Sequence, residues 1–241
     1  MSWQKWMSAL LMVPVVGYVT LCLGVYLWGA GALPADRRPN TSAIPPSMRA
    51  QYRAIHGVDD DSAIRLDPFT MPWHLFRQPG GTDELRLPTR AGRILLQRSD
   101  RPADGARRLA ADIAAVIFVS RAWSVDEQIS TVLNEAFYGR GAFGLRDAAE
   151  AWYGQFPETL RPEEFLALQV LERGPSSYDP VCRPVRFEER FRFVSAQLSV
   201  VDIDAALARA RERLRALPSA CNGVSAPAAT RLSIPVSSQA A

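Results

Sequence analysis

Apolar residues are distributed unevenly along the chain, and their spacing predicts a helical protein. A run without any charged residue extends from Trp6 to Ala35. Further on, apolar residues recur three or four positions apart, the period of an α-helix, over 47–55, 106–123, 124–137, 145–153, 162–172, 186–198 and 202–217. Alternating patterns typical of strands are few. The chain is therefore expected to be mainly α, with one long apolar segment ahead of a helical domain.

The uncharged run is long enough to cross a bilayer. The stretch Ser8 to Leu33 exceeds the roughly 20 apolar residues that a transmembrane helix requires. Small residues at 30–32 resemble a signal-peptide cleavage site, but the apolar core is about twice the usual length of such peptides. We therefore favour a transmembrane anchor over residues 1–33. Its flanking positive charges are nearly balanced and do not fix its orientation.

Composition divides the rest of the chain. Residues 34–46 contain four prolines and indicate a stalk between the anchor and the domain. The domain is expected over 47–217, with loops and short helices at 56–88. Residues 218–241 are rich in Ser, Ala and Pro and are expected to be disordered.

Charge and cysteine content narrow the function classes. The net charge of +3 is too small and too evenly spread to indicate a nucleic-acid partner. Cys22 falls in the anchor, whereas Cys182 and Cys221 lie outside it. These two would form a disulfide if the domain is extracytoplasmic, or stay free and buried, and their spacing matches no metal site.

The stretch 124–180 carries the most informative motifs. Ser124 and Glu127 have the spacing of a helix capping box. Residues 139–144, GRGAFG, match the dinucleotide-binding fingerprint, but that motif requires a strand before it, and a helix is predicted there. We interpret Gly139, Gly141 and Gly144 as a tight reversal between two helices.

Taken together, the motifs of this stretch resemble a known family. The segment VLNEAFYGRGAFGL at 132–145 resembles the fourth motif of glycosyltransferase family 51, the peptidoglycan glycosyltransferases. The resemblance continues through Ala-Ala at 148–149, Trp-Tyr-Gly at 152–154 and PSSYDP at 175–180. Residues 105–200 match well, whereas 47–104 are degenerate. His56 and Gly57 occupy the Glu-Asp positions of the first motif, and Gly-Gly-Thr at 80–82 is a remnant of the second.

The resemblance implies a lysozyme-like helical glycosyltransferase domain, held on the periplasmic side of the bacterial inner membrane by a single-pass anchor. The family polymerises lipid II glycan. A glutamate general base activates the acceptor hydroxyl, while basic side chains and a divalent cation, Mg²⁺ or Mn²⁺, offset charge on the undecaprenyl pyrophosphate leaving group. No transpeptidase domain is expected.

The family roles map onto particular residues of this chain. Asp112 falls on the third-motif glutamate, so it would hold the metal ion and take part in catalysis together with His56. Arg108 falls on the third-motif basic residue and would bind phosphate. The remaining substrate-binding residues implied by the resemblance are Asn134, Tyr138, Gly139, Gly141, Gly144 and Tyr178.

The replaced base leaves two functions open. In an active enzyme, His56 or one of the acids at 59–61 would serve as the base. Loss of a general base costs a factor of about 10² to 10⁴ in rate, so the alternative is an inactive pseudo-transglycosylase. Such a protein would bind lipid II, another undecaprenyl-pyrophosphate-linked glycan or a cell-wall synthesis protein without turnover.

Overall fold

The computed structural model describes residues 3–58, 64–77, 83–99, 103–198 and 201–215. Within these residues all regular elements are helices, and one isolated bridge pairs Phe137 with Phe143. The mainly α prediction is confirmed. In chain order the helices are α1 (Trp3–Ala30), α2 (Pro46–His56), α3 (Met71–Arg77), α4 (Asp83–Gln97), α5 (Gly105–Ala122), α6 (Val125–Glu135), α7 (Gly144–Tyr153), the short 3-10 helix η2 (Pro157–Thr159), α8 (Pro162–Arg173), α9 (Pro184–Gln197) and α10 (Ile203–Glu212).

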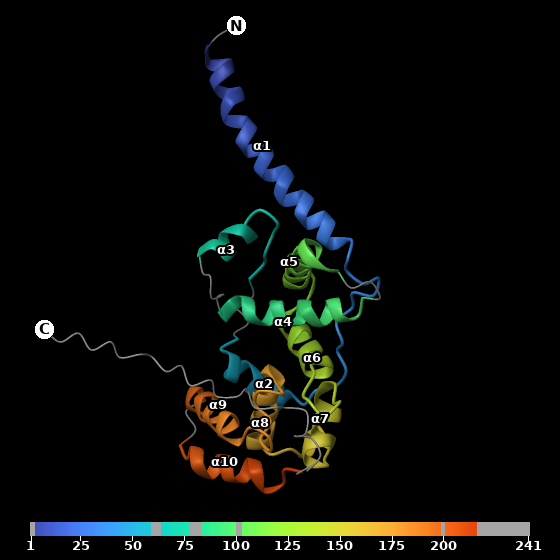
Figure 1. Ribbon diagram of the computed structural model, residues 1–241, viewed down its shortest axis with the longest axis vertical. Coiled ribbons are helices and arrows are strands. Elements are labelled where there is room, and N and C mark those ends of the chain that lie inside the picture. The colour runs from blue at the N-terminus through green and yellow to red at the C-terminus, as the bar shows by residue number, and fades with distance from the viewer. Residues whose placement is uncertain (1–2, 59–63, 78–82, 100–102, 199–200, 216–241) are drawn as a thin grey trace, which may run out of the picture.

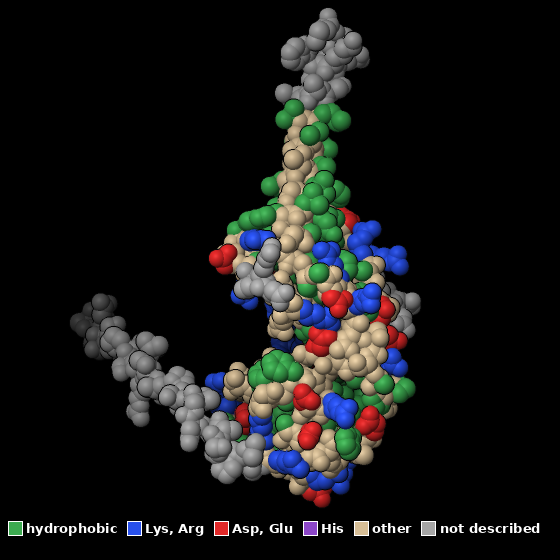
Figure 2. All heavy atoms as spheres, turned by 90° about the vertical axis from the view of Figure 1, so that its right-hand side faces the viewer, with side chains coloured by type: hydrophobic (Ala, Val, Ile, Leu, Met, Phe, Trp, Pro, Cys, Tyr) green, Lys and Arg blue, Asp and Glu red, His purple; other side chains and the backbone are tan. Residues whose placement is uncertain are grey.

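The first helix projects from the rest of the molecule (Figure 1). Its segment Met12–Ala30, 19 residues, is long and apolar enough to cross a membrane, and no other described helix is. Hydrophobic side chains gather along it (Figure 2). Its end is fixed to α5, because a Cβ on Gly29 would lie only 2.0 Å from the carbonyl oxygen of Ala110. The anchor and the domain therefore meet through a close helix contact.

The domain is arranged around α4, which crosses the middle of the molecule (Figure 1). On the anchor side, α4 packs against α5, and the interface uses small residues: a Cβ on Gly92 would lie 3.3 Å from the Cβ of Ala115. On the far side lie α2 and the helices α7 to α10. The main core joins both sides, with Tyr52, Leu95, Ile129 and Trp152 among its fully buried members. One continuous core thus holds both sides of α4.

The segment 34–46 lies along the domain. The backbone N–H of Asn40 donates to Oγ1 of Thr131 at 2.9 Å. The side-chain amide of Asn134 donates to the carbonyl of Ser42 at 3.1 Å, and Ile44 is buried. This proline-rich segment is therefore tied to α6 by hydrogen bonds.

The last described helix is held against α8 by ion pairs. Arg213 binds both carboxylate oxygens of Glu164, at 2.7 and 2.6 Å, and the Glu164 side chain is fully buried. Arg209 pairs with Glu163 at 2.6 Å on the exposed side of the same interface. This pairing explains why a stretch as polar as 203–215 packs onto the domain.

Local signals in the sequence account for several helix ends. The predicted capping box of Ser124 and Glu127 is present, and Asp202 caps α10 through the N–H of Ala205. Gly139 and Gly141 lie between two helices, as predicted, and Gly144 begins the second of them. By contrast, α4 begins at Asp83 and includes Pro88, where loops or short helices were expected. The predicted tail at 218–241 and the acids at 59–61 lie outside the described residues.

Candidate functional site

His56, the last residue of α2, lies among polar side chains from several elements. Its ring packs against that of Tyr52, with centroids 4.3 Å apart. From α4, Nη1 of Arg90 donates to the Tyr52 hydroxyl at 3.4 Å and lies 2.7 Å from Oε2 of Glu172. Gln169, three residues before Glu172 on α8, lies beside His56. Six residues form what we call the His56 cluster: Tyr52, His56, Arg90, Tyr138, Gln169 and Glu172.

Several polar atoms of the His56 cluster are buried without a hydrogen-bond partner among the described residues. They are Nε2 of His56, the Tyr138 hydroxyl and both amide atoms of Gln169. Gln169 is close enough to influence the pKa of both His56 and Tyr138, yet the three side chains form no well-aligned hydrogen bond. Buried polar groups of this kind are normally satisfied by water or a ligand. The unpartnered atoms of the His56 cluster are therefore able to form hydrogen bonds with a ligand or with water.

The surroundings of His56 disfavour its charged form. Burial, followed by the charge of Arg90, lowers the pKa of His56 to about 3; Arg173 and Arg190 act in the same direction, and Gln169 opposes them. A general base works best when its pKa lies near the operating pH. His56 is therefore a weak base here, and its neutral imidazole still forms hydrogen bonds through each ring nitrogen.

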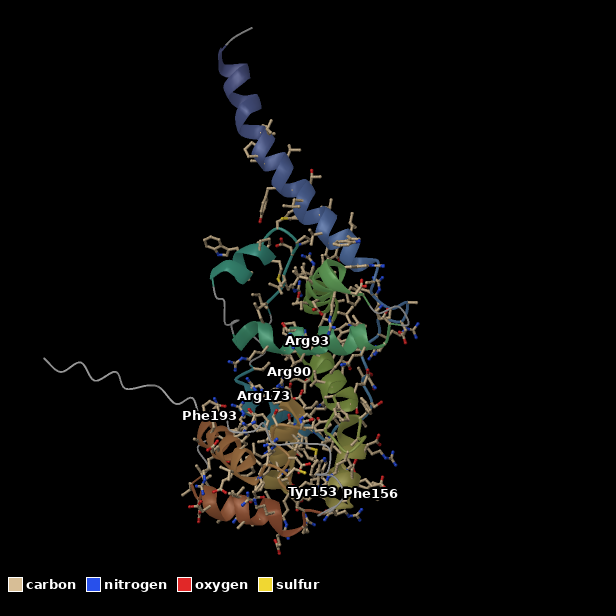
Figure 3. The ribbon with its side chains drawn as sticks, viewed as in Figure 1. Arg90, Arg93, Tyr153, Phe156, Arg173 and Phe193 are labelled. Atoms are coloured by element: carbon tan, nitrogen blue, oxygen red, sulfur yellow. The ribbon has the colours of Figure 1, made fainter. Side chains whose placement is uncertain are left out.

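Three arginines lie around His56: Arg90 on α4, Arg173 at the end of α8 and Arg190 on α9. A fourth, Arg86 on α4, lies near Arg190, and we call the four the arginine cluster. Their mutual proximity is evident at Arg190. Burial lowers the pKa of this side chain, and the charges of Arg173, Arg90 and Arg86 lower it further. Figure 3 shows Arg90 and Arg173 between α4 and the helices beneath it. Positive charge thus concentrates at one place.

Glu172 supplies negative charge to this region. Its side chain is only 6% exposed, and burial raises its pKa against the opposing effect of Arg90 and Arg173. Glu172 pairs with Arg90, and Nε of Arg190 is buried without a hydrogen-bond partner in the described chain. Guanidinium groups bind phosphate through paired, charge-assisted hydrogen bonds. The arrangement therefore suits an anion with several oxygen atoms.

A pocket of about 440 Å³ lies near the end of the anchor. Arg93 of α4 and both Arg108 and Asp112 of α5 line it. Arg93 follows Arg90 by three positions, so both point from the same face of α4. The structure thus brings the predicted pair Arg108 and Asp112 together, with Arg93, whereas the described contacts place His56 in a separate cluster. The α4 face connects the two.

The fit of a divalent cation depends on a further ligand. Asp112 supplies the carboxylate among the residues that line this pocket, beside two arginines. Among the described residues, no three or more His, Cys, Asp or Glu side chains are placed to hold a metal ion together. Because Mg²⁺ is commonly held by one or two carboxylates together with phosphate oxygens, Asp112 fits such an ion when a phosphate-bearing molecule is also bound.

Tyr178 lines another pocket, of about 430 Å³, with Arg186, Glu189, Arg190 and Phe193 from α9. The Arg190 guanidinium lies over the Phe193 ring, 4.8 Å from its centroid. Since Arg190 also belongs to the arginine cluster, this pocket adjoins the same basic region. The predicted residues Tyr138 and Tyr178 therefore approach that region from different elements.

The three glycines of the predicted site shape the turn between α6 and α7. All have positive φ, and Gly144 packs so closely that a Cβ would lie 2.2 Å from the carbonyl oxygen of Asn134. A Cβ on Gly139 would lie 2.8 Å from the ring of Pro175, whereas Gly141 faces open space. These contacts bring the 175–180 segment against the turn.

Sequence reasoning missed the residues that dominate the electrostatics, Arg90, Gln169, Glu172 and Arg173. A signal existed for two of them. Gln169 and Glu172 lie three positions apart, and the other residues from Phe165 to Leu171 are apolar, which indicates polar groups facing inward together. Arg90 gave no such signal because the helix that contains it was not predicted.

The fold and the site together define a helical domain on an apolar anchor with a basic, phosphate-compatible centre. Comparison with known proteins shows what this part of the chain resembles. Residues 93–199 match the family model named Transglycosylase. This part of the chain is therefore similar to transglycosylase domains.

Individual relatives agree with this assignment at low identity. Penicillin-binding protein 1A of Mycobacterium tuberculosis is 32% identical over 90 residues, 37% of this chain and 11% of that protein. Penicillin-binding protein 1A of Pseudomonas aeruginosa is 28% identical over 83 residues, 34% and 10% of the two chains. A Cupriavidus necator protein with a provisional transglycosylase name is 32% identical over 72 residues, 30% and 31%. The chain thus covers about a third or less of each relative.

Proposed function

We propose that this chain is a membrane-anchored, peptidoglycan glycosyltransferase-like protein of cell-wall synthesis. In this proposal it binds the diphosphate of lipid II, or of another undecaprenyl-linked glycan, and does not polymerise the glycan through His56. The transglycosylase-family domain and its penicillin-binding relatives support the substrate class. The observation that carries the proposal is the arginine cluster, in which Arg173, Arg90 and Arg86 all lie close enough to Arg190 to lower its pKa.

The proposal assigns His56 a binding role. A base must accept a proton at the working pH, and the pKa of about 3 leaves the His56 imidazole neutral there. A proton added to this ring would lie among the guanidinium groups that the diphosphate needs. The unpartnered Nε2 and the amide of Gln169 are instead free to bind uncharged groups of the ligand, such as sugar hydroxyls.

A divalent cation has a place in this proposal beside Asp112. It would be shared between the Asp112 carboxylate and the phosphate oxygens of the ligand, and it would offset phosphate charge when bound. Arg93 and Arg108 line the same pocket and would hold the remaining oxygens. Neither role requires a reaction at the anomeric carbon.

We further propose that the domain lies on the periplasmic side of the inner membrane. The described anchor supports membrane attachment. Cys182 is disulfide-bonded, which favours an oxidising compartment, and Cys22 in the anchor is free. Cys221 lies outside the described residues. Binding of a cell-wall synthesis protein remains part of the proposal on the strength of the family alone.

The test compares binding and polymerisation of fluorescent lipid II by the full-length protein in detergent, with Mg²⁺ or Mn²⁺. The main variant is Arg173→Gln, because Arg173 is exposed and belongs to the arginine cluster. Loss of one charge-assisted hydrogen bond should weaken binding roughly ten- to a hundred-fold. The matched control is Arg192→Gln on the outer face of α9, where Arg192 pairs with Glu188 and Asp204.

The outcomes separate the two functions that the sequence left open. Binding that weakens in Arg173→Gln but not in Arg192→Gln, without polymer, supports the binding protein. Polymer made by the unaltered chain and lost in His56→Gln would establish an enzyme with His56 as its base, against the proposal. Absence of binding by the unaltered chain would refute both.

A further inference from the structure

An apolar pocket of about 240 Å³ lies between the anchor and the domain. Its walls include Leu21 and Val25 from α1, Met71 from α3 and Ile117 from α5, and no charged residue lines it. It is distinct from the basic pockets described above. Apolar cavities of this kind exclude water, and even one of about 150 Å³ accepts a molecule as large as benzene.

The α1 wall of this pocket lies inside the membrane whichever way the anchor is placed. No charged residue occurs between Lys5 and Asp36. A helix needs about 20 residues to cross the hydrocarbon, and every window of that length within 6–35 includes residues 16–25. The pocket residues Tyr18, Leu21 and Val25 fall in this shared stretch. The medium at the pocket wall is therefore lipid.

The domain segment opposite α1 is built for that medium. The Tyr18 hydroxyl donates to the carbonyl of Phe69 at 2.6 Å. Oδ1 of Asp67 accepts the backbone N–H groups of Phe69 and Thr70 at 2.8 and 2.9 Å, so the polar groups of this turn are paired, as contact with lipid requires. Trp73 beside it is 60% exposed, which is typical of side chains at the bilayer interface.

We propose that this pocket holds part of one acyl chain of a bilayer phospholipid, clamped between α1, α3 and α5. The pocket offers a hydrocarbon chain apolar walls from three helices, and the surrounding membrane supplies such chains at high concentration. The absence of charged lining residues leaves the lipid head group at the interface, outside the pocket. The bound lipid completes the contact between the anchor and the domain.

A phospholipid suits the pocket better than the tail of the proposed glycan ligand. On α5, Ile113 and Ile117 line the apolar pocket, whereas Arg108 and Asp112 line the basic one. Each apolar residue follows its basic-pocket counterpart by five positions, which corresponds to about 140° around the helix. A head group at Arg108 and a chain at Ile117 would thus lie on different faces of α5. The inference is therefore independent of glycan binding.

The experiment uses the full chain in nanodiscs that contain a phospholipid with a photoreactive diazirine in its acyl chain. Labelled peptides are identified by mass spectrometry. The unaltered chain should be labelled at α1 around Cys22 and at α5 around Ile117. Ile117→Trp fills the pocket and should lose that labelling. Leu23→Trp is the matched control, because Leu23 lies on α1 outside the pocket and is 42% exposed.

Further arms keep the test decisive. Val25→Phe fills the pocket from α1 and replaces Ile117→Trp should that variant fail to fold by circular dichroism. Equal labelling in the filled and control variants would overturn the proposal, because the label would then report general contact with the bilayer. A polyprenyl phosphate carrying the same diazirine is compared in parallel. Pocket labelling by that probe alone would overturn the phospholipid assignment.

Discussion

The electrostatics of His56 predict a specific loss of stability in mild acid. In the folded chain the His56 pKa is about 3, whereas an exposed histidine has a pKa of about 6.5. Between these values the unfolded chain binds a proton that the folded chain does not. The contribution of neutral His56 to the free energy of unfolding is therefore complete above about pH 6.5, decreases as the pH falls, and is fully lost near pH 3.

The magnitude follows from the same two pKa values. A pH of 5 is about 1.5 units below the histidine pKa of the unfolded chain. This difference lowers the free energy of unfolding by about 2 kcal/mol relative to pH 8. In His56→Gln this contribution is absent. Whatever the substitution costs at pH 8, the gap between the unaltered chain and the variant should therefore shift by about 2 kcal/mol at pH 5.

The assay is urea unfolding in detergent at pH 8 and pH 5, followed by tryptophan fluorescence. Comparing the change between the two pH values removes contributions from carboxylates, because both chains share them. His74→Gln, which alters the other histidine of the chain, serves as the matched control for the loss of an imidazole. Equal pH dependence in the unaltered chain and His56→Gln would refute the described burial of His56 among the arginines.

Two further predictions concern stability. Arg213→Ala removes the ion-pair partner of the fully buried Glu164 and should lower the free energy of unfolding in urea by about 3 kcal/mol. Arg209→Ala breaks an exposed ion pair and should lower it by less than about 1 kcal/mol. Similar losses in the two variants would contradict the difference in burial. In Gly144→Ala the new Cβ would overlap a backbone carbonyl, so α6 and α7 could not pack together and the cooperative thermal transition should be lost. In Gly141→Ala the Cβ meets no atom. That variant should lose only the roughly 1 kcal/mol of stability that a positive φ costs a residue with a side chain. A milder effect of Gly144→Ala than of Gly141→Ala would contradict this account.

The helices after residue 105 were predictable because local chemistry and long-range packing agree there. Ser124, Asp202 and the proline at 162 mark helix starts that the structure reproduces. The apolar face of α2, with Met48, Tyr52 and Ile55, is buried as its spacing implies. In such segments the preferences of the chain alone identify the element.

The middle of the chain was harder to interpret because its local signals conflict with its packing. Pro88 and Gly92 both disfavour a helix, yet α4 continues through both of them. Its helical conformation depends on packing against α5, where the small side chain of Ala115 admits the close approach of Gly92. Tertiary packing overrides local propensity in this case. The helix face that carries Arg90 and Arg93 could therefore not be predicted from the sequence.

The histidine at position 56 and the arginine cluster are best explained together. A glutamate at this position would place a carboxylate beside Arg90, Arg173 and Arg190, which would hold it ionised and be partly neutralised by it. A neutral imidazole at the same place adds no charge. The positive charge of the arginine cluster then remains available to a phosphate-bearing ligand. In the proposed function, a neutral His56 therefore leaves the anion site its positive charge, which is consistent with binding without turnover.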